Sequence, residues 1–279
     1  MAAALVEPEH MTVISTSRMR HDLDPHGTAK DFLDTLCRAL VQLPEPRDER
    51  VGIAIPGPFD YEHGIGLFRD VAKFEALHKV DVRSGLRACI GRGADHIRFL
   101  NDADAFGLGE WVSGVGVDHD RIVGLTLGTG VGSVFLNGGT WVIEGPTVPP
   151  EGRVDLLEIE GHRLEESFSR RAIRRSYRQT TGRDLDVKEI AAIARTGDEA
   201  ALEILHGAAR LLGAAVAPFV ETFAPTLIVV GGSITGAWDL LSASFRIGLG
   251  SKSTSSWEIR VGALGNDAPL VGAAYHALN

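Results

Sequence analysis

The strongest constraint on the fold is a glycine turn between two apolar strands. Residues 122–127 predict a buried strand, residues 128–132 (Gly-Thr-Gly-Val-Gly) predict a tight turn, and a second strand begins at Ser133. Glycines in such a turn let the backbone approach a ligand and aim successive amide N–H groups in one direction. The turn is therefore a candidate phosphate site, with a tight hairpin that binds nothing as the alternative. The candidate phosphate-binding residues are Gly128, Thr129, Gly130 and Gly132.

Composition and charge exclude several classes of protein. The 279 residues carry a net charge of −9, which argues against broad binding of nucleic acid or a membrane surface. We find no apolar run of about 18 residues and no basic leader at the N-terminus, so we expect a cytoplasmic protein without a spanning helix. Cys37 and Cys89 fall in apolar helical patterns and predict two buried free thiols in a reducing compartment.

The two halves of the chain follow one plan. The second half predicts strands at 122–127, 133–136 and 140–143, a long helical stretch, and further strands at 227–230 and 258–261. The first half predicts strands at 3–6, 11–15, 51–55 and 97–100 and helices at 28–42 and 81–90, which gives the same order of strands and helices. It has no counterpart of the strand 122–127 or of its glycine turn.

The helical stretch 190–223 is expected to form two helices that break near Gly197-Asp198. Its apolar stripe after residue 201 indicates either core packing or a helix–helix interface, and it permits a homodimer.

Two further segments follow buried strands. Asn101-Asp102 follows the strand 97–100 and begins a helix, where a carboxylate can accept a proton from a substrate hydroxyl or can simply cap the helix. Gly231, Gly232 and Ser233 follow the strand 227–230 and offer a flat backbone to a purine. Together with the first glycine turn, this second turn favours a nucleotide ligand.

Taken together, these residues resemble the ROK family of sugar kinases and repressors, which has the hexokinase–actin fold. Asn101-Asp102-Ala103-Asp104 is similar to the family's catalytic motif, residues 125–133 to its second phosphate loop, and residues 229–233 to its adenosine motif. Residues 51–60, with Pro56-Gly57-Pro58, match its strand and turn. The resemblance covers nearly the whole chain.

The resemblance implies an α/β protein with two lobes of the ribonuclease H-like (actin-like ATPase) fold. We expect an N-terminal lobe over 1–114, lacking its initial strand, and a C-terminal nucleotide-binding lobe over 115–279. It also implies a glucokinase-like enzyme that transfers a phosphoryl group from ATP to the 6-hydroxyl of a hexose with Mg²⁺. Asp102 would be the base, and Asn101 and Glu151 would orient the sugar in a cleft between the lobes.

The chain departs from the family pattern in three places. The opening strand with its Asp-x-Gly-Gly-Thr phosphate loop has no counterpart, so either it lies upstream of Met1 or the chain does not bind ATP as its relatives do. The zinc cysteines are missing from 160–169, so no structural zinc is expected, and His162 there is either structural or a sugar contact. The sugar-binding Glu-x-Gly-His is represented by Glu151 and Gly152, with Val154 where His is expected.

Two alternatives stay open. The arginine-rich stretch 163–178 is either a solvated helix face or a polyanion site, which leaves ATP and polyphosphate open as donors. The missing loop favours the alternative of a catalytically impaired sugar-binding or regulatory protein, whereas the intact Asn101-Asp102 pair and the glycine turn 128–132 favour the kinase, which is our main expectation. A hexose and a nucleotide are the expected partners under the kinase interpretation.

Overall fold

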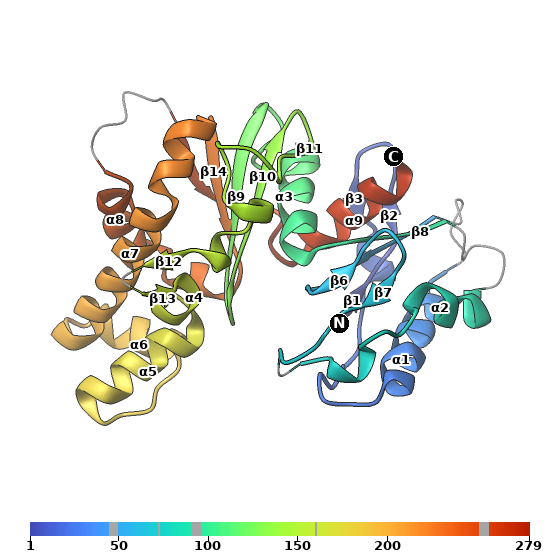
Figure 1. Ribbon diagram of the computed structural model, residues 1–279, viewed down its shortest axis with the longest axis horizontal. Coiled ribbons are helices and arrows are strands. Elements are labelled where there is room, and N and C mark those ends of the chain that lie inside the picture. The colour runs from blue at the N-terminus through green and yellow to red at the C-terminus, as the bar shows by residue number, and fades with distance from the viewer. Residues whose placement is uncertain (45–49, 72, 91–95, 160, 251–256) are drawn as a thin grey trace. The chain divides into compact units, whose positions relative to one another are not determined.

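The computed structural model describes residues 1–279 except 45–49, 72, 91–95, 160 and 251–256. The chain forms two compact units (Figure 1). Unit 1 contains Met1–Gly114 and Asn266–Asn279, and unit 2 contains Val115–Gly265. The expected second lobe, 115–279, differs from unit 2 at its end, because helix α9 (Ala268–Leu278) packs against α3 (Asp102–Ser113) in unit 1.

Unit 2 is built on a five-stranded sheet in the order β11-β10-β9-β14-β15. The central strand β9 pairs antiparallel with β10 and parallel with β14. All the strands predicted in this half of the chain are present. The central strands β9, β10 and β14 are the continuous apolar runs, which are typical of strands buried on both faces. Their bounds are β9 Arg121–Leu127, β10 Val131–Asn137, β11 Thr140–Trp141, β14 Leu227–Gly231 and β15 Glu258–Val261.

Helices α5 to α8 gather on one side of this sheet (Figure 1). The predicted break near Gly197-Asp198 is confirmed, since the Asp198 carboxylate accepts the Ala201 amide and begins α7. Helix α8 was not predicted from the sequence. The remaining elements of unit 2 are β12 Glu158–Ile159, β13 His162–Arg163, α4 Leu164–Ser167, α5 Arg170–Thr181, α6 Val187–Ala194, α7 Glu199–Phe223 and α8 Trp238–Leu249.

The apolar stripe of α7 is core packing. Leu205, Leu212 and Val216 are buried in the main apolar cluster of unit 2. A Cβ on Gly213 would lie 2.2 Å from the Phe245 carbonyl oxygen, so α7 and α8 cross in backbone contact. By length and composition α7 alone among the described helices could cross a bilayer, but 44% of its most apolar window is buried inside the protein.

Unit 1 contains only two-stranded sheets among its described residues. β5 pairs parallel with β8, and the other three pairs, β1 with β4, β2 with β3 and β6 with β7, are antiparallel. The predicted strands at 51–55 and 97–100 are confirmed as β5 and β8. The bounds are β1 Ala2–Ala3, β2 Val6–Glu7, β3 Thr12–Val13, β4 Met19–Arg20, β5 Val51–Ala54, β6 Phe59–Asp60, β7 Ile65–Gly66 and β8 Ile97–Leu100.

Helices α1 (Ala29–Gln42) and α2 (Val82–Ile90) are also where the sequence predicts them. α1 begins at a capping box, in which Thr28 and Asp31 each accept the other's backbone amide. The apolar faces of both helices join an aromatic cluster that holds Phe32, Phe59 and Phe99. This cluster is the core of unit 1.

The prediction of free thiols is wrong. Cys37 on α1 and Cys89 on α2 form a disulfide, with their Cα atoms 5.7 Å apart. The packing of α1 against α2 brings the two cysteines together, although they are 52 residues apart in the sequence. Because disulfides are typical of oxidising compartments, cysteine usage no longer supports the expected cytoplasmic location.

The two units repeat one order of elements. In unit 1 the order includes β2, β3, α1, β5, α2 and β8, and in unit 2 it includes β10, β11, α7, β14, α8 and β15. Each series is followed along the chain by a helix of unit 1, which is α3 after β8 and α9 after β15. In each unit the two hairpin strands are antiparallel and the two later strands are parallel. The strand before the hairpin is paired differently in the two units: in unit 2 it is β9, which pairs with β10, and in unit 1 it is β1, which pairs with β4.

Candidate functional site

Asn101 and Asp102 stand where two parallel strands of unit 1 end. Asn101 follows β8 and caps α3, accepting the Ala103 amide at 2.8 Å through its Oδ1. The same amide lies 3.0 Å from Asp102 Oδ1, in the first turn of the helix. The Asp102 residue is exposed, so its carboxylate can meet a substrate at the carboxyl ends of β5 and β8.

Tyr61 holds the Asn101 side chain, a role that sequence reasoning missed. The Asn101 Nδ2 donates to the Tyr61 hydroxyl at 3.0 Å, and that hydroxyl lies 3.3 Å from the Ile55 carbonyl oxygen. The Gly57-Pro58 peptide is cis, and a Cβ on Gly57 would lie 3.9 Å from Asn101 Nδ2. The same Cβ would lie 3.3 Å from the Tyr61 hydroxyl, so glycine lets the Pro-Gly-Pro turn pack closely beside Tyr61 and Asn101. The aromatic residue soon after this turn was the sequence signal for the contact.

Asp104 is a half-buried acid two residues after Asp102 in α3. Burial of the carboxyl group and, to a smaller extent, the nearby charge of Asp102 together raise the pKa of Asp104 to about 7. A carboxyl group that titrates near neutrality is common at functional sites. The interaction between Asp104 and Asp102 is a repulsion between their carboxylate charges.

The two glycine turns of unit 2 lie side by side. Strands β9 and β14 are parallel neighbours, with Thr126 paired to Gly231, so both turns follow the same end of the sheet. A Cβ on Gly128 would lie 3.6 Å from the Ser233 Oγ. Gly232 has φ of 91°, and a Cβ there would lie 2.3 Å from the Leu127 carbonyl oxygen. Only glycine allows the second turn to pack this closely on the end of β9.

The first turn is fixed from within and from α5. The Gly128 amide donates to the Gly130 carbonyl at 3.0 Å, and the Gly128 carbonyl accepts the Arg170 amide at 2.9 Å. Thr129 at the tip is exposed. A Cβ on Gly130 would lie 3.1 Å from Glu165 Oε1, and that carboxylate pairs with Arg171 at 2.9 Å. The turn therefore presents a small, rigid backbone with one carboxylate beside it.

Glu151 sits on a strained turn that is anchored to β10. It is exposed, with φ of 58°, and its carboxylate lies 3.7 Å from the Arg153 guanidinium. The buried Ser133 hydroxyl donates to the Gly152 carbonyl at 2.7 Å and accepts the Val154 amide at 2.9 Å. Val154, at the expected position of the family's histidine, is 0% exposed and therefore cannot contact a ligand.

His162 is exposed in the short strand β13. Its Nδ1 lies 3.6 Å from Glu166 Oε2, four residues further on. No contact between His162 and Glu151 is present among the described side chains. The structure therefore brings together Asn101 with Asp102, and the first glycine turn with the second, but it does not join His162 to Glu151.

Three of the five arginines of α5 are paired with acids of the same unit. Arg170 is paired with Asp186, and Arg174 Nη2 lies 3.1 Å from Asp184 Oδ1. With Arg171 on Glu165, three arginines have acidic partners, as a solvated helix face requires. This pairing weakens the polyanion interpretation of the stretch.

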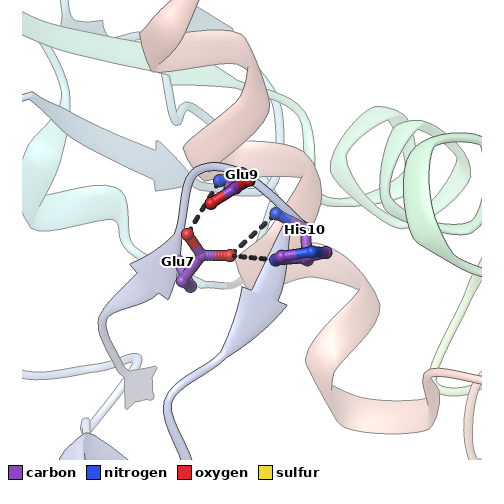
Figure 2. Close-up of side chains that lie close together, drawn as sticks. All are labelled: Glu7, Glu9 and His10. Carbon is purple, nitrogen blue, oxygen red and sulfur yellow. Dashed lines mark hydrogen bonds and ion pairs between the residues drawn. The ribbon is translucent and has the colours of Figure 1, made fainter.

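An acidic cluster in the β2–β3 turn is explained by its own hydrogen bonds (Figure 2). The Glu7 carboxylate accepts the backbone amides of Glu9 at 2.9 Å and His10 at 2.7 Å, and His10 Nδ1 lies 3.1 Å away. These amides hold the pKa of Glu7 below its ordinary value. The cluster closes a hairpin turn.

Comparison with known proteins agrees with this geometry. The model of the ROK family matches residues 2–279. This chain belongs to the ROK family. Its mixed α/β fold is therefore the actin-like ATPase fold of ROK kinases, in which ligands bind at the ends of the central strands.

Sugar kinases are among the relatives of this ROK chain. A glucokinase from Thermotoga maritima is 31% identical over 252 residues, which cover 80% of this chain and 77% of that protein. An N-acetyl-D-glucosamine kinase from Salmonella typhi is 28% identical over 76% of this chain and 74% of its own length. The crystal structure of a ROK family glucokinase from Streptomyces griseus in complex with glucose and AMPPNP has 26% identity and a TM-score of 0.79, over 99% of this chain and 95% of that one.

Proposed function

We propose that this ROK protein binds a hexose and ATP and transfers the γ-phosphoryl group to the sugar 6-hydroxyl. The observation that carries the proposal is the Asn101-Asp102 pair, an exposed carboxylate next to an amide held by Tyr61 at the ends of two parallel strands. The solved relative with glucose and AMPPNP supports the choice of ligands.

Each candidate residue has one role in this reaction. Asp102 accepts the proton of the attacking hydroxyl, which general bases do with gains of about 10²- to 10⁴-fold. Asn101 and Glu151 orient the sugar by hydrogen bonds, and His162 contacts a sugar hydroxyl. Because Val154 is buried, the sugar has one fewer polar partner than the family pattern provides.

The glycine turns hold the nucleotide. Gly128, Thr129, Gly130 and Gly132 form the turn that receives the phosphates, and Gly231, Gly232 and Ser233 flank the adenosine. Because the Gly128 amide already donates to the Gly130 carbonyl, the amides at the tip of the turn, of Thr129 and Gly130, are the proposed donors. The carboxylate of Glu165 lies beside Gly130, where it would attract a divalent cation but repel a phosphate group that has no cation bound. Mg²⁺, when bound, neutralises charge on the phosphate oxygens during transfer.

A second candidate is a protein that binds sugar without phosphorylating it. It is favoured by one observation: the described residues of unit 1 contain no glycine turn like that at 128–132. A reaction that depends on positioning and charge stabilisation loses much of its rate when half of the phosphate contacts are missing.

A coupled assay with Mg²⁺ and ATP over glucose, mannose and N-acetylglucosamine decides between the two. The kinase proposal predicts transfer to at least one sugar, together with loss of transfer in Asp102→Asn and unchanged transfer in the exposed control Asp34→Asn. Sugar binding by calorimetry without transfer to any hexose would replace the proposal by the second candidate.

A further inference from the structure

One arginine outside the candidate site is fixed beside the second glycine turn. Helix α6 ends at Arg195 and packs against Ser233–Ala237, the short 3-10 helix that directly follows Gly231-Gly232. This short helix leads into α8. Arg195 therefore reaches, from a separate helix, the segment of chain that continues from the proposed adenosine turn.

The guanidinium of Arg195 is held along one edge. Its Nε donates to Asp239 Oδ2 at 2.9 Å, and its Nη2 donates to Asp239 Oδ1 at 2.7 Å and to the Gly236 carbonyl at 2.8 Å. Such a two-bond pair with a carboxylate fixes the plane of the guanidinium as well as its position. The Arg195 side chain is still 42% exposed, so a ligand can reach it.

The charge of Arg195 is already matched by Asp239. The hydrogen-bonded guanidinium holds the pKa of Asp239 below its ordinary value, so this carboxylate is ionised near neutral pH. The pair carries no net charge, and it therefore attracts a phosphate group less than a free arginine would. What the pair offers to a ligand is the flat surface of the guanidinium, which packs well on aromatic rings.

Three features of unit 2 follow the order of the parts of a nucleotide. A Cβ on Gly128, in the proposed phosphate turn, would lie 3.6 Å from the Ser233 Oγ, in the proposed adenosine turn. From Gly232 the short helix runs to Gly236, whose carbonyl holds Arg195. At about 2 Å per residue this step is roughly 8 Å long. Phosphate turn, adenosine turn and arginine thus parallel phosphate, ribose and base.

The short helix between the adenosine turn and Arg195 is itself held in place. The Gly232 carbonyl accepts the Thr235 amide at 3.2 Å and the Thr235 hydroxyl at 2.7 Å. Ile234 and Ala237 are buried in the apolar core of unit 2. The separation between the adenosine turn and the arginine is therefore set by the fold and not by the ligand.

We propose that Arg195 recognises the base of the bound nucleotide, with its guanidinium plane stacked on the adenine ring. Asp239 and the Gly236 carbonyl keep that plane in one orientation. Because stacking grows with the area of the ring, a purine is preferred to a pyrimidine. This inference rests on the proposed function, since it assigns the base end of the same nucleotide site.

Calorimetry with AMPPNP and with inorganic tripolyphosphate separates the base from the phosphates. Arg195→Lys keeps the positive charge that pairs with Asp239 but lacks the planar group. We expect this variant to bind AMPPNP about tenfold more weakly than wild type and tripolyphosphate within about twofold of wild type. The preference of the wild type for ATP over CTP should fall in the same variant.

Arg260→Lys on β15 is the matched control. Arg260 also pairs with a carboxylate, that of Glu258, and its side chain is 46% exposed, close to the value for Arg195. Its affinities for both ligands should equal those of the wild type. Equal losses for AMPPNP and tripolyphosphate in Arg195→Lys would show a structural ion pair only and would overturn the proposal, as would an unchanged affinity for AMPPNP.

A measurement on the unaltered chain does not depend on the folding of a variant. The Arg195 Nε–H donates to Asp239, which slows its exchange with water and makes it observable in the ¹⁵N-labelled protein. A ring stacked on the guanidinium shields this proton, so AMPPNP should shift its resonance upfield, whereas tripolyphosphate should leave it in place. An unshifted resonance at saturating AMPPNP would contradict the proposal.

The two proposals fail in different ways. If the wild-type chain binds neither AMPPNP nor tripolyphosphate, the proposed nucleotide site is wrong, and the role of Arg195 is wrong with it. If the chain binds AMPPNP without any change at Arg195, the role of Arg195 alone is wrong and the proposed kinase activity still stands.

Discussion

The two units share an order of elements but differ at the centre of their sheets. In unit 2, β9 joins a hairpin to a parallel pair and continues into the glycine turn at 128–132. In unit 1, the corresponding pairs β2–β3 and β5–β8 remain separate around a hollow. The same central strand that completes the sheet of unit 2 also places at its end the glycine turn that we propose as the phosphate site.

The two units differ in the chemical groups that we propose they contribute to the reaction. Under the proposed function, unit 2 supplies backbone amides for the phosphates and unit 1 supplies the carboxylate of Asp102. The predictions below test this division, from the largest expected effect to the smallest.

Asp102→Asn is expected to lower phosphoryl transfer about 10²- to 10⁴-fold, because the amide cannot accept the proton of the sugar hydroxyl. Since Asn keeps the shape of Asp, sugar affinity by calorimetry should stay within about twofold. Asp34→Asn, an exposed change on α1, is the control. Transfer at the wild-type rate in the Asp102 variant would exclude Asp102 as the base.

Cys37→Ser is expected to destabilise unit 1 by about 2–4 kcal/mol, because the disulfide to Cys89 restricts the unfolded chain. Urea unfolding followed by the fluorescence of Trp111, in unit 1, measures the loss. Cys89→Ser and the double variant should give the same value, since either change removes the one bond. Additive losses in the double variant would show that the cysteines act separately.

Gly232→Ala is expected to destabilise unit 2 by about 2 kcal/mol and to weaken nucleotide binding. The new Cβ would clash with the Leu127 carbonyl oxygen, and the positive φ disfavours alanine. Gly236→Ala is the matched control, because a Cβ there meets nothing within 4 Å. Equal nucleotide affinities for the two variants, measured by calorimetry, would remove the second turn from the binding site.

Asp104→Asn is expected to change the pH dependence of stability by about 1–3 kcal/mol. Burial raises the pKa of Asp104 from 3.8 to about 7 in the folded chain, so wild-type stability contains a contribution that is present at low pH and lost as pH rises through this range. The variant should therefore gain stability relative to wild type between pH 5 and pH 8. Parallel curves of unfolding free energy against pH would contradict a raised pKa.

Sequence patterns predicted the sheet of unit 2 and the parallel pair of unit 1, because long apolar runs leave few alternatives. Helix α8 and the two-residue strands β4, β6 and β7 were missed, since such short strands depend on tertiary contacts rather than on their own residues. The disulfide was missed because its partners are 52 residues apart and composition suggested a reducing compartment.

The candidate site shows the same limit. The positions of Asn101, Asp102 and both glycine turns follow from strand ends that the sequence marks clearly. The contact between Gly128 and Ser233, and the hydrogen bond from Asn101 to Tyr61, depend on which strands are neighbours. Those neighbours are fixed by packing of the whole unit, which no local pattern specifies.

The measurement that tests the difference between the units most directly is native-state hydrogen exchange of the unliganded chain. If β5 has an open edge and β14 lies inside a complete sheet, the amides of Gly52 and Ala54 should exchange at least about a hundredfold faster than those of Val229 and Val230. Equal protection at these four amides would show that the edge of β5 is closed and would contradict the account.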